Sequence, residues 1–456
     1  MAGIGFELRK LLNKKSLFGL LQAYGYAGII SSGPWVLSIL GIMAIGIISV
    51  NLQTQSDVVL SFLISITYLM AFSIIIGGWL QLMLTRFVSD LIYAKKQQEI
   101  ISNLLGALIV TSITSLIVAF ISWPLFPEQS LAYKLLMLSS LVLLSNIWIL
   151  VVMLSGLRAY KKVIAAFFMG YGLTITFSLL LRGYGVEGLL AGFLIGQSMM
   201  MYFMLGIIVH EYTADSLISF DFLDKNKVFY SLAAISIIYN LGVWTDKFVF
   251  WFNPITSEAI IGPLRSSIIY DPPIFLSYLT IIPGMAVFLL RMEADFVDKY
   301  NEFYSAIRDG GSLGRIRDLK KSMINTIRSS FLEIFKVQAV TILIVIYAAD
   351  HILPLFKIST NYRMLFSIDV AAVGVQVVLL GVFNVLFYLD KRIIILNLTI
   401  FFALCNLILT VTSQHLGPIY YGYGFAISVL LTTIIGFVIL NQKLMRLEYE
   451  TFMLQR

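Results

Sequence analysis

The sequence predicts an all-α polytopic membrane protein with about twelve transmembrane helices. Of the 456 residues, 59% are hydrophobic and only 12% are charged, and the mean hydropathy is +0.90, whereas a soluble domain carries about 25% charge. Long apolar runs such as 58–84 match the ~20 residues that a helix needs to cross the hydrocarbon, and they exclude a barrel of short alternating strands. The distribution of the positive charges is the third observation.

The apolar runs place six predicted spans in each half of the chain. In the first half they lie near 24–50, 58–84, 104–123, 135–157, 163–181 and 189–209. In the second half they lie near 229–252, 274–290, 334–353, 364–388, 393–412 and 424–441. We therefore expect an N-terminal six-helix lobe, 1–228, and a C-terminal six-helix lobe, 229–456, as in transporters built from two similar halves.

The 32 Lys and Arg residues are distributed unevenly among the connections between these spans. Most lie at the termini and in the even-numbered connections. The exceptions are Lys247 within a span and five residues in the odd-numbered connections: Lys134, Arg182, Arg265, Lys357 and Arg363. Cytoplasmic loops retain positive residues because these resist translocation. The pattern predicts a protein of the bacterial inner membrane with both termini in the cytoplasm, and it accounts for the net charge of +7 without a nucleic-acid partner.

The longest predicted cytoplasmic connection, 291–336, has the pattern of an amphipathic helical hairpin. Its first half places aromatic residues on one face, and Asp309-Gly310-Gly311 ends that helix because glycine readily adopts a left-handed cap. The hairpin either lies on anionic lipid headgroups or forms a docking surface for a cytoplasmic partner, and these roles are compatible. Its second half places an apolar stripe opposite basic residues that include Arg315, Arg317, Lys320 and Lys321.

The first span carries Pro34 within the stretch 31–35, SSGPW. Proline lacks an amide hydrogen and clashes with the preceding turn, so we expect the helix to be interrupted and bent near the bilayer centre. Tyr24 and Tyr26, just below the bend, could stack on or hydrogen-bond a sugar. The alternative is a kink that serves only helix packing.

The seventh span combines polar, charged and aromatic residues. A helical period of 100° places Asn240, Trp244 and Lys247 on one stripe, and Asp246 points away from it. An ionised side chain at mid-bilayer costs about 2.5–3.5 kcal/mol on insertion scales. The Asp246–Lys247 pair is therefore expected either at an interface between the lobes or near the outer membrane surface, where the tryptophans would form an ordinary aromatic belt.

The eighth span repeats the combination of a bend and an aromatic residue. Tyr278 precedes Pro283-Gly284, and Arg291 marks the predicted cytoplasmic mouth. Together the three spans predict a substrate path between the lobes, lined by polar and aromatic side chains. Its predicted residues are Tyr24, Tyr26, Pro34, Asn240, Trp244, Asp246, Lys247, Tyr278 and Arg291.

The sequence lacks the patterns of a soluble enzyme or a metal site. The three histidines are scattered, no GxxxxGK[ST] motif occurs, and Cys405 lies in an apolar run, where small core filler is its ordinary role. The first outer loop, 51–57, is too small for a sugar-nucleotide site, which weakens the alternative of a polytopic glycosyltransferase. We therefore predict a transporter that is not an enzyme and that uses no cofactor or metal.

The opening residues, MAGIGFELRKLL followed by LLQAYGYAGIISSGPWVLS, closely resemble the PelG family, the multispanning transporters of the Pel exopolysaccharide system. The resemblance is near-continuous over 1–39, and the remaining chain is similar in topology. PelG resembles the polysaccharide transporters of the multidrug/oligosaccharidyl-lipid/polysaccharide (MOP) exporter superfamily. Membership implies two MATE-like six-helix bundles around a central cavity, which is lined by the first, second, seventh and eighth spans.

The resemblance also implies a substrate and partners. The substrate would be a Pel-type polymer rich in N-acetylhexosamine, exported for the biofilm matrix. The partners would be the cytoplasmic glycosyltransferase PelF, the cyclic-di-GMP receptor PelD, and PelE. Drug antiporters of this fold often carry an acidic residue in the first span, whereas 24–50 has none, so an ion cycle through that helix is not expected. The alternatives are a lipid-linked oligosaccharide flippase or drug antiporter of the same fold, and a polytopic glycosyltransferase or polymerase.

Overall fold

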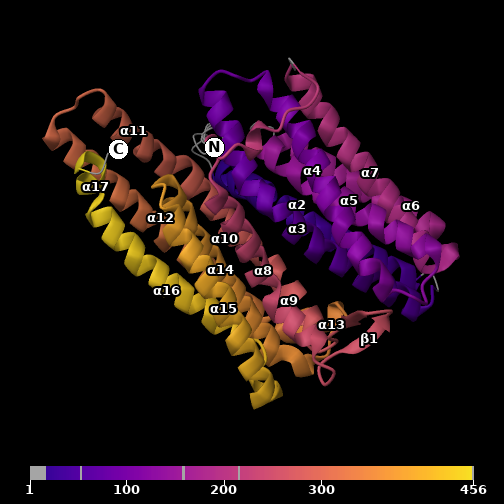
Figure 1. Ribbon diagram of the computed structural model, residues 1–456. Helices are drawn as coiled ribbons and strands as arrows, with labels where there is room; N and C mark the ends of the chain where they lie inside the picture. Colours follow the sequence, from indigo (N-terminus) through magenta and orange to yellow (C-terminus); the bar gives the residue numbers. More distant parts are fainter. Residues whose placement is uncertain (1–16, 52–53, 157–159, 214–215, 454–456) are drawn as a thin grey trace. The chain divides into compact units, whose positions relative to one another are not determined.

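The protein folds almost entirely into α-helices (Figure 1). A computed structural model describes residues 17–51, 54–156, 160–213 and 216–453. The packing of the chain divides it into two compact units. We call Pro34–Ile268 the N-terminal unit, and Met1–Gly33 together with Ile269–Arg456 the C-terminal unit. In each unit long helices lie side by side (Figure 1).

The N-terminal unit is a helical bundle that carries a small β-hairpin. In it α3 packs on α5 and α8, and α6 packs on α7. The two strands are antiparallel. The elements are α2 (Leu17–Asn51), which enters this unit at Pro34, α3 (Ser56–Tyr93), α4 (Glu99–Ser122), α5 (Leu131–Gly156), α6 (Tyr160–Leu181), α7 (Gly185–Glu211), α8 (Tyr230–Phe252), β1 (Glu258–Ile261) and β2 (Leu264–Ser266).

The C-terminal unit contains the predicted cytoplasmic hairpin and the remaining helices. The turn between α11 and α12 lies at the opposite end of this unit from α13 (Figure 1). The elements are α9 (Asp271–Ser277), α10 (Ile281–Leu290), the π-helix η5 (Arg291–Phe296), α11 (Val297–Arg308), α12 (Leu313–Tyr347), α13 (Ala349–Leu355), α14 (Arg363–Tyr388), α15 (Arg392–Leu416), α16 (Tyr423–Met445) and α17 (Leu447–Met453).

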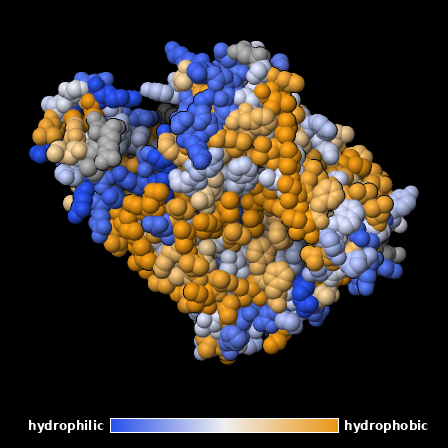
Figure 2. Space-filling model, viewed as in Figure 1, coloured by the Kyte–Doolittle hydropathy of each residue, from blue (hydrophilic) through white to orange (hydrophobic). Residues whose placement is uncertain are grey.

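Every predicted span overlaps a helix, which confirms the helical character of these segments. Within the described residues, nine helical ranges are long and apolar enough to cross a membrane, and one of them, Lys162–Glu211, holds both α6 and α7. Apolar side chains gather along the helices and hydrophilic ones near their ends (Figure 2). The chain is therefore a multi-pass membrane protein, whereas the count of twelve spans and the cytoplasmic termini stay predictions.

The hairpin predicted over 291–336 is a helix–turn–helix, as expected. Gly310 has a φ of +70°, and the amide of Gly311 donates to the carbonyl of Ala306 at 2.8 Å, which is the cap that the glycines predict. The second arm continues without a break into the predicted ninth span, because α12 is one helix of 35 residues.

Two features of the predicted architecture need correction. The strands β1 and β2, joined through Gly262-Pro263, make the fold nearly rather than wholly α-helical. The interruption predicted at Pro34 is wrong, because α2 is one helix from Leu17 to Asn51, whereas the bend predicted there stays a prediction. A proline removes one backbone hydrogen bond, and transmembrane helices tolerate that loss where surrounding groups compensate for it.

The grouping of the chain also differs from a division at 228/229. Helix α8 packs on α3, and it therefore belongs to the same compact unit as the helices that precede it. The boundary falls after α8, at Ile268. The predicted lobes, 1–228 and 229–456, describe topology and stay a prediction.

Close packing of α6 and α7 depends on three glycines four residues apart, Gly188, Gly192 and Gly196. A Cβ on Gly192 would collide with the backbone of Ser178, and one on Gly196 would collide with Thr174. Small residues at this spacing allow two transmembrane helices to approach closely. The motif fixes α7 against α6 within the N-terminal unit.

We predict that Gly192→Val lowers the stability of the protein by about 1–3 kcal/mol, because the added side chain overpacks the α6–α7 contact. Thermal unfolding of the detergent-purified chain measures this effect. Gly206→Val on the same helix is the matched control, since a Cβ there meets nothing within 4 Å. Equal unfolding temperatures for the two variants would show that the close contact does not contribute to stability.

Candidate functional site

The predicted path residue Asn240 joins α8 to α3. Its Nδ2 donates to the carbonyl of Ile74 at 3.0 Å. Gly78 leaves room for this contact, because a Cβ there would lie 2.6 Å from the same nitrogen. A side-chain amide that satisfies a carbonyl of a neighbouring helix holds two transmembrane helices together. Asn240 therefore has a structural role inside the N-terminal unit.

Trp244 belongs to an aromatic cluster that packs α8 on α3. Trp251 stacks on Tyr68 with ring centroids 4.4 Å apart and an interplanar angle of 22°. The ring of Trp244 lies 6.0 Å from that of Trp251, and Phe248 reaches Phe72 at 5.9 Å. Trp244 and Trp251 are 4% and 1% exposed. Trp244, which the helical period places on the predicted stripe, is therefore buried in the packing between α8 and α3.

Asp246 and Lys247 form a buried ion pair. The ammonium nitrogen of Lys247 lies 3.0 Å from Oδ2 of Asp246 and donates to the carbonyl of Val243 at 2.9 Å. Both side chains are at most 1% exposed. Removing one partner of a buried pair typically costs about 3–5 kcal/mol, because the other charge stays buried. The pair is thus fixed within the protein interior and does not lie in an exposed belt of aromatic residues.

The helical geometry of the eighth span changes just before Pro283-Gly284, where the bend is predicted. A 3₁₀ turn, Tyr278–Thr280, separates α9 from α10, and Tyr278 is buried. The carbonyl of Thr280 accepts a hydrogen bond from Nε2 of Gln338 on α12 at 3.1 Å. Gly284 provides space for the Gln338 side chain, because a Cβ there would collide with it. Gln338 therefore links α12 to the 3₁₀ turn of the eighth span.

Arg291, predicted at the cytoplasmic mouth, is the centre of an ion-pair network. Its guanidinium forms a fork on the carboxylate of Glu333 with distances of 2.5 and 2.9 Å, and it donates to Asp295 at 2.6 Å. Bidentate arginine–carboxylate pairs are the most directional ion pairs in proteins. Arg291 thereby joins the π-helix to α12, while about a third of its side chain remains exposed.

Glu293, on the same π-helix, is 6% exposed. Its carboxylate accepts hydrogen bonds from Nδ2 of Asn384 at 2.8 Å and from the hydroxyl of Tyr388 at 3.1 Å. Helices η5 and α14 are therefore linked through a buried acid. π-Helical turns in long helices often occur at functional sites.

The hairpin exposes only part of the surface predicted for docking. Phe296 and Phe303 of the aromatic face are fully buried. Lys320 is also held, because its ammonium donates to the carbonyl of Met445 at 3.1 Å and lies 3.4 Å from Glu448. Of the four basic residues predicted for docking, Arg315, Arg317 and Lys321 are exposed.

A hollow of about 500 Å³ lies beside these residues, between α11 and α12. Asp298, Glu302 and Asp309 line it together with Arg315. Within the described ranges, no group of three or more His, Cys, Asp or Glu side chains is placed to hold a metal ion. The hollow adds acidic groups to the hairpin surface beside its exposed cations.

The short helix α17 is held to the ends of α15 and α16 by Glu450. The ammonium groups of Lys391 and Lys443 each lie 2.6 Å from its carboxylate. Burial raises the pKa of Glu450, but these two ammonium groups outweigh burial and hold the pKa below its usual value. The ion pairs position α17, and with it Glu448, the partner of Lys320.

The remaining path residues lie on α2. Tyr24 is half-buried, whereas the side chains of Tyr26 and Pro34 lie outside the described residues. Asn240, Trp244, Asp246 and Lys247 come together on α8 of the N-terminal unit, and Tyr278 and Arg291 belong to the C-terminal unit. A path lined by these residues stays a prediction.

Sequence reasoning missed the role of the β-hairpin. The guanidinium of Arg265 donates to the carbonyls of Trp251 and Ser257 at 3.1 and 2.8 Å, and the hydroxyl of Tyr68 donates to the carbonyl of Arg265 at 3.0 Å. These contacts fasten the hairpin to α3 and to the end of α8. Gly262-Pro263 between apolar residues is the turn signal that predicts such a hairpin.

Comparison with known proteins gives one family match. A model of the family PelG, an exopolysaccharide exporter family (EPS-E), matches residues 1–452. A search of curated protein sequences gave no match.

Solved structures of similar fold are transporters of the MOP superfamily. An outward-facing multidrug resistance MATE family transporter has a TM-score of 0.65 at 14% identity, covering 93% of this chain and 96% of that chain. A MOP superfamily transporter from Pyrococcus furiosus has a TM-score of 0.64 at 15% identity, covering 92% and 96%. An inward-facing MATE family transporter has a TM-score of 0.62 at 13% identity, covering 93% and 95%. The fold is therefore MOP/MATE-like.

We predict that Glu450→Gln speeds amide hydrogen exchange in α17 by roughly fivefold, because it weakens two ion pairs worth about 1 kcal/mol together. Since the pKa of Glu450 is lowered, the stabilisation is complete above the usual glutamate pKa of about 4.3 and is lost as the pH falls through the lower folded-state value. Glu302→Gln, which alters an exposed pair on α11, is the control. Unchanged protection of α17 in Glu450→Gln would contradict the anchoring role.

Proposed function

Because the chain belongs to the PelG family of exopolysaccharide exporters, we propose that it moves a Pel-type polymer rich in N-acetylhexosamine across the bacterial inner membrane. The observation that carries this proposal is the match of the family model to residues 1–452. The MOP/MATE-like fold supports it, since the solved structures that share the fold are membrane transporters. Family and fold indicate a transporter, and the polymer is then made by a separate enzyme.

We infer that this enzyme is a cytoplasmic glycosyltransferase of the PelF type, which hands over the growing chain, and that PelD and PelE complete the complex. The hairpin α11–α12 is the proposed docking surface for the glycosyltransferase. Arg317 and Lys321 are exposed there, and neither is needed to fix the hairpin in the way that Lys320 is. Charged side chains at the rim of an interface steer association and set its specificity.

The proposed path uses aromatic and polar side chains along the first, seventh and eighth spans. Stacking of a sugar ring on an aromatic face requires no single geometry, so a sliding polymer tolerates it better than a set of directional hydrogen bonds. Among the three described aromatic residues of the set Tyr24 is the most accessible, because it is half-buried whereas Trp244 and Tyr278 are each 4% exposed. Tyr24 is therefore the residue at which a contact with substrate is tested most directly.

A drug antiporter or a lipid-linked oligosaccharide flippase remains the alternative function on this fold. Two of the three similar structures above concern multidrug resistance transporters, but at 13–14% identity they carry information on the fold alone. Measuring polymer export and dye efflux in the same cells distinguishes the two functions. Loss of efflux with normal export on deletion of the gene would overturn the proposal.

We predict that Tyr24→Ala lowers polymer export roughly twofold to tenfold without changing the amount of protein in the membrane, because an aromatic contact is worth about 0.5–1.5 kcal/mol. Export is measured as matrix polysaccharide per quantity of membrane-inserted transporter. Tyr24→Phe should retain most activity, since it keeps the stacking face. Tyr184→Ala, at a 77% exposed tyrosine, is the control, and equal loss in both alanine variants would refute a specific contact.

Charge reversal at the hairpin tests docking. We predict that Arg317→Glu combined with Lys321→Glu lowers co-purification of the glycosyltransferase at least fivefold, because like charges then oppose each other across the interface. The matched control is Lys95→Glu combined with Lys225→Glu, which reverses exposed charges on the N-terminal unit. If the hairpin variant co-purifies the glycosyltransferase as well as the wild-type protein does, the docking proposal is wrong and the hairpin is a lipid-surface element.

A further inference from the structure

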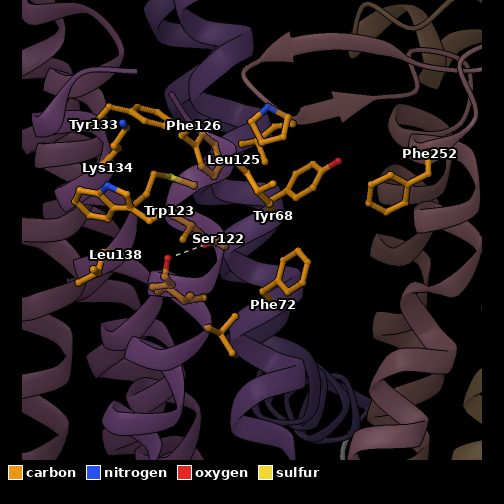
Figure 3. A pocket seen from close by; sticks show the side chains of 17 residues that line it. Tyr68, Phe72, Ser122, Trp123, Leu125, Phe126, Tyr133, Lys134, Leu138 and Phe252 are labelled. Atoms are coloured by element: carbon orange, nitrogen blue, oxygen red, sulfur yellow. Dashed lines mark hydrogen bonds between the residues drawn. The ribbon is translucent and has the colours of Figure 1, made fainter. Parts of the chain in front are cut away.

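The N-terminal unit contains an apolar pocket of about 200 Å³ that the proposed path does not use (Figure 3). It lies at the end of the unit that the sequence predicts to face outward. Its walls come from α3, the end of α4, the start of α5, the end of α8 and the β1–β2 turn. Tyr68 and Phe72 project from α3, and Phe252 faces them from the end of α8 (Figure 3).

The three hydroxyl groups on the pocket wall already have hydrogen-bond partners. The hydroxyl of Tyr68 donates to the carbonyl of Arg265, that of Tyr133 lies 2.8 Å from Oγ of Ser65, and that of Ser122 donates to the carbonyl of Ala119 at 2.9 Å. A sugar binds through many hydroxyls, and burying them without partners costs free energy. The wall therefore suits an apolar ligand and disfavours a carbohydrate.

One positive charge lies in this otherwise apolar lining. The ammonium of Lys134 lies 5.8 Å from the centroid of the Trp123 ring, a cation–π contact, and its side chain is partly exposed. An aromatic face leaves the three N–H donors of a lysine able to bind an anion. Trp and Lys together are typical of the level at which a membrane's headgroups begin.

The exposed apolar surface at the end of α4 meets the pocket at Leu125, which lines it. Ile113, Ile117 and Ile121 on that helix are 51%, 52% and 73% exposed, and Leu125 at the pocket is 59% exposed. In a membrane-spanning helix such residues contact lipid chains. An acyl chain can therefore pass from the bilayer into the pocket without crossing a polar surface.

We propose that this pocket binds one acyl chain of an anionic phospholipid, with the lipid phosphate beside Lys134. The apolar wall, the satisfied hydroxyls, the single cation and the lipid-facing entrance all fit that ligand. Because Pro263 and Leu264 of the β-hairpin form part of the wall, a bound chain packs directly against the hairpin. The lipid would thus help to hold the hairpin on α3, in addition to the contacts of Tyr68 and Arg265.

Native mass spectrometry of the delipidated full chain tests the proposal, with phosphatidylglycerol as probe and diacylglycerol as its phosphate-free counterpart. One phosphatidylglycerol should bind per chain. Lys134→Gln should lower the affinity for phosphatidylglycerol about fivefold, because one charge contact is lost. It should leave the affinity for diacylglycerol unchanged. Ala119→Phe, which fills the pocket, should lower the affinity for both lipids about tenfold or more. Ile113→Phe, on the lipid-facing side of the same helix, should change neither affinity.

Three results would overturn the proposal. These are wild-type affinity in Ala119→Phe, equal loss of diacylglycerol and phosphatidylglycerol in Lys134→Gln, and displacement of the lipid by an N-acetylhexosamine oligosaccharide. Inorganic phosphate alone should not compete, and competition by it would show an anion site without an acyl chain. Should Ala119→Phe fail to fold, the site is located by photolabelling the wild-type protein with phosphatidylglycerol that carries a photoreactive acyl chain. Labelling within 68–72, 118–141, 252 or 263–264, the segments that line the pocket, supports the proposal, and labelling confined to other segments excludes it.

Discussion

Helices inside a bilayer gain little hydrophobic free energy from meeting one another, because lipid chains are as apolar as their side chains. This constraint determines how both units hold together. The glycines at 188, 192 and 196 bring α7 onto α6 by removing the side chains that would separate them. In the C-terminal unit the contact is polar instead. The side chain of Gln338 lies against Gly284 and Gly374 and donates to the carbonyl of Thr280. Close approach and internal polar contacts replace the hydrophobic core of a soluble protein.

The same constraint changes how polar residues in the spans should be interpreted. A polar side chain in an apolar run is costly against lipid, so its presence indicates either function or helix association. Asn240 belongs to the second class, since its amide satisfies a carbonyl of α3. Arg291 fits both classes, because its bidentate ion pair with Glu333 joins two helices while about a third of its side chain stays exposed. Exposure of the side chain, rather than polarity in the sequence, separates candidate path residues from packing residues, and it favours Tyr24 over Trp244.

The sequence predicts local features well and distant partners poorly. Hydropathy located the helices, and Gly310 located the hairpin turn, because each depends on residues close in the chain. The partner of Lys320 is Glu448, which no spacing within the hairpin can reveal. The β-hairpin was not predicted, because a four-residue strand beside long apolar helices shows only a weak alternation of apolar and polar residues. Pro34 does not end its helix, because α2 continues from Leu17 to Asn51, and transmembrane helices tolerate the loss of one backbone hydrogen bond where other groups compensate for it.

The proposed docking surface and the core of the C-terminal unit share one element. Helix α12 runs from the hairpin turn through Glu333 to Gln338 without interruption, a distance of about 35 Å from Arg315 at 1.5 Å per residue. Along that length it is fixed by the arginine fork and by the carbonyl of Thr280. Helix α12 also packs on α14, and Phe331 contacts Phe437 of α16, so a partner at the exposed end docks on a helix that is held along its length. The arginine fork and the carbonyl of Thr280 lie at the two places where the backbone of the eighth span departs from regular α-helix, the π-helix and the 3₁₀ turn, so α12 supports that span where its helical geometry changes.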